Sequence, residues 1–132
     1  MGRVQLRRTK QIKEARKRNY DYLTKHLSRF DNLILPTPLP GADICWFSYP
    51  ITIIGDRGRL LRYLEKKGIE TRPLFSGNIT RHPAYVNSKF RVSGKLYGSD
   101  HITKYSFWIS THPSLSNSDL EYMVKTFNEY FK

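Results

Sequence analysis

The residues best suited to chemistry lie close together in the middle of the chain. Between positions 72 and 82 stand two arginines, an amide, a hydroxyl and an imidazole: Arg72, Asn78, Thr80, Arg81 and His82. Such groups donate hydrogen bonds to phosphate and sugar oxygens, and arginine can do so with two parallel bonds. We therefore predict that these five residues bind a substrate with a diphosphate or sugar hydroxyls. The alternative for Arg72, at the end of a strand, is a bridge to a carboxylate.

The local sequence predicts a loop that displays these side chains. Pro73 cannot donate to a strand ladder, so the strand before it should end there. Gly77 followed by Asn78 favours a turn. We therefore expect the polar groups of this loop to be displayed to solvent rather than packed.

Outside this loop, the sequence predicts neither a catalytic residue nor a metal site. No two histidines have the i, i+4 spacing of metal ligands, and no nucleophile stands beside a base. We interpret His26, His101 and His112 as structural or solvated. Cys45 is the single cysteine, so no intramolecular disulfide can form. Since Cys45 adjoins Trp46, we expect a small thiol that is buried or half-buried.

Helical periodicity and capping signals predict three helices that would position this loop. The first covers residues 4–30, and its apolar stripe consists of Ile12, Ala15, Asn19, Leu23, Leu27 and Phe30. The second covers residues 59–67, with Gly68 as a left-handed cap. The third follows Ser116, which together with Asp119 has the spacing of a capping box.

Four β-rich segments alternate with these helices, at residues 33–35, 46–54, 69–72 and 107–110. Pro50 interrupts the second segment, which predicts an edge position or a bulge there. Helices with one apolar stripe and short strands predict an α/β fold of the α+β two-layer type. We expect one domain with a small, partly antiparallel sheet that helices cover on one face.

The chain is strongly basic, with a formal net charge of +12. Residues 1–30 carry +8 of it, from ten Lys or Arg against Glu14 and Asp21. We interpret this segment as a solvated helix that a partner domain would cover, and we expect nucleic acid or other polyanions to bind only non-specifically. No apolar run is long enough to span a bilayer and no signal peptide is evident, so we expect a cytoplasmic protein without a membrane partner.

Several segments together resemble one known family. They are Gly2–Leu6, Ala15–Tyr20, Trp46–Ile51, the loop from Gly68 to Tyr85, Phe107–Ile109, His112–Leu115 and Asp119–Tyr122. In this order they resemble the C-terminal small domain of the DegT-type PLP-dependent sugar aminotransferases and dehydratases. The resemblance is greatest to the branch of nucleotide-sugar 3-dehydrases that act on CDP-4-keto-6-deoxyhexoses in lipopolysaccharide deoxysugar biosynthesis.

This resemblance implies an organisation and a function. Residues 1–30 would be a basic domain-linking helix, and residues 31–132 the small domain of a fold-type I PLP enzyme, whose cofactor domain is absent here. PLP or PMP and the catalytic base belong to that absent domain, so we expect the chain alone to bind no cofactor and to be inactive. The implied partners are a CDP-hexose, a cofactor-domain polypeptide and a second copy of the chain.

Two alternatives remain open from the sequence. The chain can belong to a sugar aminotransferase, which a lysine or histidine in the absent domain would distinguish from a dehydratase. It can also be a stand-alone basic remnant that binds nucleic acid or another polyanion.

Overall fold

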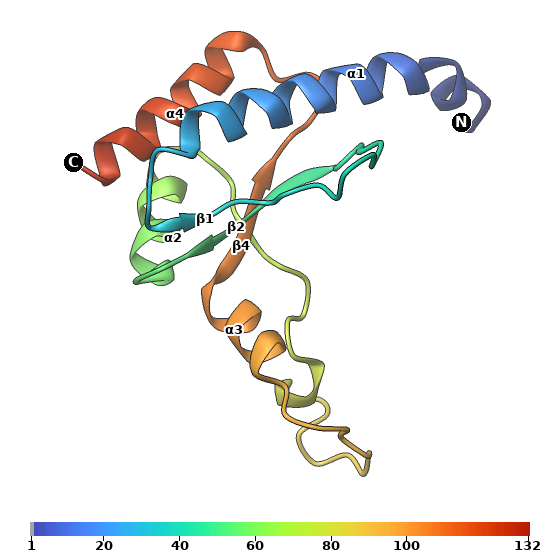
Figure 1. The fold of residues 1–132 in the computed structure, drawn as a ribbon, viewed down its shortest axis with the longest axis vertical. Helices are drawn as coiled ribbons and strands as arrows, with labels where there is room; N and C mark the ends of the chain where they lie inside the picture. Colours follow the sequence, from blue (N-terminus) through green and yellow to red (C-terminus); the bar gives the residue numbers. More distant parts are fainter. Residues whose placement is uncertain (1) are drawn as a thin grey trace.

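The computed structural model describes residues 2–132, and in this range helices cover a small antiparallel sheet (Figure 1). The sheet order is β1-β2-β4-β3, with every neighbouring pair antiparallel. This architecture confirms the predicted α/β class. The strands are β1 (Leu33–Ile34), β2 (Ser48–Ile53), β3 (Arg72–Pro73) and β4 (Ser106–Ser110), and the helices are α1 (Gly2–Leu27), α2 (Arg57–Lys66), η1 (Ile79–Arg81, 3-10), α3 (Tyr97–Tyr105) and α4 (Asn117–Tyr130).

The core lies between one face of the sheet and helices α1, α2 and α4. Alternate residues of β2 and β4 point into it, with Tyr49 opposite Ile109 and Ile51 opposite Phe107. The helices contribute fully buried side chains from their apolar stripes, namely Leu23, Leu27, Leu60, Leu64, Leu120 and Phe127. The other face of the sheet carries Pro50 opposite Trp108, both half-buried.

Helix α1 differs along its length. The predicted stripe is confirmed in the second half, where Asn19, Leu23 and Leu27 are buried. Residues 2–11 are exposed, and this end of the helix extends away from the rest of the molecule (Figure 1). The helix ends at Leu27, before the predicted boundary at residue 30, because the chain turns there and the Phe30 N–H bonds to the Leu27 carbonyl.

The predicted end signals of the other helices are confirmed. Gly68 has φ +78°, and the Ile69 N–H bonds back to the Leu64 carbonyl at 2.9 Å, which closes α2 with a Schellman motif. The Ser116 side chain and the Asp119 carboxylate form the reciprocal bonds of a capping box at the start of α4.

Three predictions of local structure were wrong. The strand predicted at 69–72 is β3, at Arg72–Pro73, because the Ile69 N–H closes α2 and cannot join the sheet. The strand was also predicted to end before Pro73, but Pro73 belongs to β3 and pairs with Phe107. Because β3 is at the edge of the sheet, the backbone N–H that proline lacks is not needed for the ladder. Cys45 is exposed rather than buried, because its two neighbours, Ile44 and Trp46, are the side chains that pack against the core here.

Pro50 occupies a position that the sequence only partly predicted. Strand β2 lies between two strands, not at the edge of the sheet. However, β1 pairs only with Thr52 and Ile53, so beside Pro50 one side of β2 has no partner. The proline therefore stands at a locally open side of an interior strand.

Residues 74–105 form an arm that extends from the sheet (Figure 1). It runs out from β3 through η1 and returns through α3 to β4. Helix α3 was not among the predicted helices, because it is short, Leu96 at its N-cap forms no side-chain cap, and none of its residues is buried. Every residue from 81 to 95 is exposed. Four of the five residues predicted to bind substrate lie in the outgoing part of this arm, and the fifth, Arg72, lies in β3 just before it.

Candidate functional site

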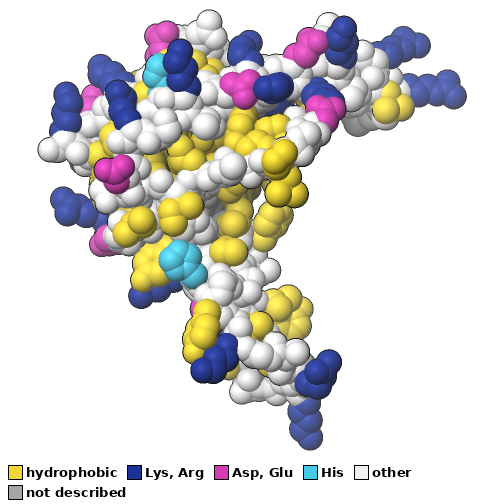
Figure 2. Space-filling view, in the orientation of Figure 1, with side chains coloured by type: hydrophobic (Ala, Val, Ile, Leu, Met, Phe, Trp, Pro, Cys, Tyr) yellow, Lys and Arg dark blue, Asp and Glu magenta, His cyan; other side chains and the backbone are white. Residues whose placement is uncertain are grey.

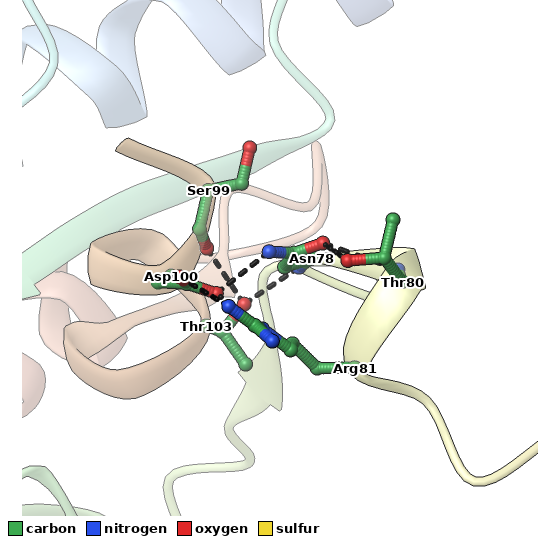
Figure 3. A network of polar contacts seen from close by, with 6 residues as sticks. All are labelled: Asn78, Thr80, Arg81, Ser99, Asp100 and Thr103. Carbon is green, nitrogen blue, oxygen red and sulfur yellow. Dashed lines mark hydrogen bonds and ion pairs between the residues drawn. The ribbon is translucent and has the colours of Figure 1, made fainter. Parts of the chain in front are cut away.

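The base of the arm is held by a network of polar side chains around Asn78 (Figure 3). The Asn78 amide nitrogen donates to Asp100 Oδ1 at 2.6 Å, and its backbone N–H donates to Thr103 Oγ1 at 2.6 Å. The Thr103 hydroxyl donates in turn to the Ser99 carbonyl at 2.7 Å. Asn78 thus joins the outgoing segment of the arm to α3.

Asn78 also begins η1. Its Oδ1 accepts hydrogen bonds from the Thr80 N–H at 3.1 Å and from the Thr80 hydroxyl at 2.7 Å. With every polar atom of its side chain bonded, Asn78 is only 3% exposed. The prediction that the polar groups of this loop are displayed was therefore wrong for Asn78, because α3 covers it.

Arg81 completes the network through an ion pair. Its Nε lies 3.3 Å from Asp100 Oδ1, and its Nη2 lies 3.3 Å from Asp100 Oδ2. Hydrogen bonds from Arg81 and Asn78 hold the pKa of the Asp100 carboxyl below its usual value. The positive charge of Arg81 is therefore balanced within the arm.

The structure separates the other two predicted residues from this network. Arg72 lies at the edge of the sheet and pairs with Glu70, as its alternative interpretation predicted. His82 is exposed and lines a cavity that none of Asn78, Thr80 and Arg81 lines. Of the five predicted residues, only Asn78, Thr80 and Arg81 therefore form one cluster.

Two cavities flank the arm. The first, of about 390 Å³, is the Arg81–Asp100 cavity, which Lys95 and Tyr97 also line. The second, of about 460 Å³, is the Arg57–His82 cavity, and its walls include Arg57, Phe75, Ser76, His82, Ile102 and Thr103. Arg57 and Phe75 were not singled out from the sequence. Arg57 enters only through the tertiary structure, whereas Phe75 lies inside the predicted loop and could have been noticed as an aromatic residue beside a turn.

Arg57 links α2 to the base of the arm. Its Nη1 donates to the Thr103 carbonyl at 2.8 Å and to the Ser106 carbonyl at 2.9 Å. These bonds use one nitrogen of the guanidinium group, which has five N–H donors in all. Arg57 is thus held in a defined orientation with donors remaining.

Neither cavity fits the PLP or PMP that the family resemblance implies. A PLP site commonly combines a lysine for the Schiff base with a partner for the pyridine nitrogen. In the Arg81–Asp100 cavity, Lys95 is accompanied by a carboxylate already bonded to Arg81 and Asn78. The residues lining the Arg57–His82 cavity include no lysine and no carboxylate. We therefore assign the cofactor to neither cavity.

Residues 2–132 contain no group of three or more His, Cys, Asp or Glu placed to hold a metal ion. None of the helices in this part of the chain combines the length and the apolar character needed to cross a membrane.

Comparison of sequences identifies relatives across nearly the whole chain. The dTDP-4-dehydro-2,6-dideoxy-D-glucose 3-dehydratase of Saccharopolyspora spinosa is 37% identical over 130 residues, which are 96% of this chain and 28% of that protein. The lipopolysaccharide biosynthesis protein RfbH of Salmonella typhimurium is 38% identical over 135 residues, 98% of this chain and 31% of that protein. The chain therefore spans less than a third of the length of either relative.

Comparison of structures finds the same fold in solved enzyme structures. E. coli GDP-4-keto-6-deoxy-D-mannose-3-dehydratase with bound hydrated PLP superposes with a TM-score of 0.81, over 95% of this chain and 33% of that one, at 19% identity. The sequence profile of the DegT/DnrJ/EryC1/StrS aminotransferase family matches residues 1–128. Because this match extends over almost the entire sequence, the chain belongs to the DegT/DnrJ/EryC1/StrS aminotransferase family.

Proposed function

We propose that this chain is part of a PLP- or PMP-dependent nucleotide-sugar 3-dehydratase of deoxysugar synthesis. The observation that carries the proposal is the 37% identity to a protein named as a sugar 3-dehydratase, over 96% of the chain. The similarity to RfbH, which is named for lipopolysaccharide biosynthesis, supports a role in making surface polysaccharide. The family resemblance implies a cytidine nucleotide, whereas the name of the Saccharopolyspora relative contains a thymidine nucleotide, so the binding titration compares CDP with dTDP.

Within such an enzyme, residues 1–30 would link two domains and residues 31–132 would form the small domain. The cofactor and the catalytic base would lie in the two-thirds of the relatives that this chain does not span. This division is consistent with the two arm cavities, neither of which combines a free lysine with a free carboxylate.

The contribution proposed for this chain is recognition of the nucleotide sugar and packing against the rest of the enzyme. His82, Arg72 and Arg81 are exposed, so they are the predicted residues that could touch a ligand directly, although the two arginines already pair with Glu70 and Asp100. Asn78, Thr80 and Arg81 would act by holding the arm in position, since they bond mainly to one another and to Asp100.

A chimeric enzyme tests this function. In the Saccharopolyspora relative, the segment that aligns with this chain is replaced by residues 1–132. The chimera is then given cofactor, glutamate and dTDP-4-dehydro-2,6-dideoxy-D-glucose labelled with ¹⁸O at C3, and release of the label into water is measured. We expect release well above that of a variant lacking the segment altogether.

Retention of cofactor absorbance after desalting reports whether the chimera has folded. A folded, cofactor-loaded chimera that keeps the C3 label, or that instead makes an amino sugar from glutamate, contradicts the dehydratase proposal. The second result would favour the aminotransferase alternative.

A further inference from the structure

The Arg57–His82 cavity lies where the arm leaves the sheet, and its lining is partly apolar and partly basic. Pro73, Leu74 and Ile102 provide apolar walls, and Arg57 and His82 provide nitrogen donors. Figure 2 shows hydrophobic side chains gathered where the arm meets the body of the molecule. This mixture of an apolar wall and a few convergent polar groups is typical of small-molecule sites.

The lack of a carboxylate in its lining distinguishes this cavity from its neighbour. In the Arg81–Asp100 cavity, Arg81 is paired with Asp100, and the second cation, Lys95, lies over the Tyr97 ring, 5.5 Å from its centroid. The residues lining the Arg57–His82 cavity include no acidic side chain, and Arg57 is held by two carbonyl oxygens, which carry no formal charge. The adjacent Asp56 accepts from the Arg59 N–H as the cap of α2. A positive charge that is oriented by neutral groups favours an anionic ligand.

Phe75 adds an aromatic surface to this cavity. It is 71% exposed, although it is one of the largest apolar side chains in the arm. It is also the one non-glycine residue with positive φ, at 50°, within residues 2–132. Non-glycine residues in this conformation are strained, and they cluster at ligand sites. Phe47 contacts the ring from one side, with centroids 6.2 Å apart and an interplanar angle of 65°.

We propose that the Arg57–His82 cavity binds a nucleoside diphosphate, with the phosphates on Arg57 and His82 and the base stacked on Phe75. The ligand class rests on the proposed function, because the nucleotide sugar supplies a diphosphate and a planar base. The site itself rests on the cavity: a cation without a carboxylate partner, an imidazole and an exposed aromatic ring line the same hollow. Of the residues predicted from the sequence, this site includes only His82.

The test is a titration of the ¹⁵N-labelled full chain with dTDP, CDP and inorganic diphosphate, followed by amide chemical shifts. We expect the largest shifts at residues 75–77, at His82 and at Thr103. Phe75→Ala should lower the affinity for both nucleotides at least about fivefold, which is the low end of the range for loss of one base stack. The affinity for inorganic diphosphate should not change. His82→Ala should weaken all three ligands.

Matched control variants lie on the same arm. Phe90→Ala is the control for Phe75→Ala, and His101→Ala is the control for His82→Ala, because each removes an exposed ring that does not line the cavity. Both control variants should bind the ligands as tightly as the unchanged chain. Arg57→Lys keeps the charge but loses the planar fork, so it should weaken all three ligands as well. Arg57 also holds the base of the arm, so the binding result for Arg57→Lys counts only if the amide spectrum of the ligand-free variant matches that of the unchanged chain. If the spectrum differs, the binding result for His82→Ala decides the test.

Three outcomes would overturn this site. In the first, the largest chemical-shift changes fall on α1. In the second, the Phe75→Ala and Phe90→Ala variants bind the nucleotides equally well. In the third, inorganic diphosphate binds as tightly as the nucleotides. The titration needs no turnover, so its failure is separable from a failure of the chimeric enzyme. A chimera that dehydrates with Phe75 replaced and with unchanged KM would disprove the site while leaving the proposed function intact.

Discussion

At the scale of single residues, Gly77 lies so close to Thr103 of α3 that it has no room for a side chain. A Cβ atom on Gly77 would stand 2.3 Å from Thr103 Oγ1 and 2.9 Å from the Thr103 Cα, and Gly77 has φ +58°. The same hydroxyl accepts from the Asn78 N–H. Only a residue without a side chain therefore lets the turn approach α3 closely enough for this bond.

Gly77→Ala should accordingly destabilise the base of the arm by about 2 to 4 kcal/mol, from the left-handed backbone and the clash with α3 together. The measurement is the free energy of opening from hydrogen exchange at the Asn78 amide. Gly94→Ala is the control, because Gly94 has φ +74° with no atom within 4 Å of its would-be Cβ. It should cost only about 1 to 2 kcal/mol, from the backbone alone. Equal losses in the two variants would show that the contact with Thr103 is unimportant.

At the scale of elements, α1 is one helix with two different roles. Its second half packs in the core through Leu23 and Leu27, which are fully buried. Its first half contributes nothing to the core, and Val4 and Leu6 are 59% and 73% exposed. A helix whose apolar residues are buried only over its last turns has a free end available for another surface.

The same substitution at two positions measures this difference. Leu23→Ala should lower the free energy of unfolding by about 2 to 5 kcal/mol, since it leaves a cavity between α1 and the sheet. Leu6→Ala should change it by no more than about 0.5 kcal/mol, as is usual for exposed positions. Urea unfolding followed by circular dichroism gives both values. A loss at Leu6 comparable with that at Leu23 would mean that the first half of α1 is packed in solution, for example against a second copy.

At the scale of the whole molecule, positive charge is spread over two distant regions. Residues 1–30 carry +8 of the net +12. Lys and Arg side chains extend from α1 and from the arm in Figure 2. Charge distributed in this way attracts polyanions without a defined recognition surface.

Binding to DNA should therefore be weak, indifferent to base sequence and lost by about 200 mM salt, because phosphate neutralisation is its only source. Fluorescence anisotropy with two duplexes of unrelated sequence, each titrated at several salt concentrations, measures this. The two plots of log affinity against log salt concentration are expected to coincide. A complex that prefers one duplex and survives 200 mM salt would instead support the alternative of a nucleic-acid-binding protein.

Most of the secondary structure could be predicted because its causes are local. The stripe of Leu23 and Leu27, the left-handed Gly68 and the capping box at Ser116 each act within a few residues. The two-layer class followed from the same periodicities. Prediction was wrong where a backbone group had two possible partners, as at Ile69, whose N–H closes α2 instead of extending a strand. It also missed α3, a helix of nine residues that has no side-chain N-cap and buries none of its residues.

The sequence by itself determined helices α1, α2 and α4, the apolar faces of these helices and the family that the chain resembles. Only the tertiary structure decided which of the predicted site residues come together and which partners they bond. It brings Asp100 and Thr103 to Asn78 across 22 and 25 residues of sequence, and it brings Arg57 to the Thr103 carbonyl across 46. These contacts have no periodic signal, because they depend on how the arm folds back onto the sheet. That folding balances the charge of Arg81 with Asp100 and leaves Arg57 and His82 to share one cavity.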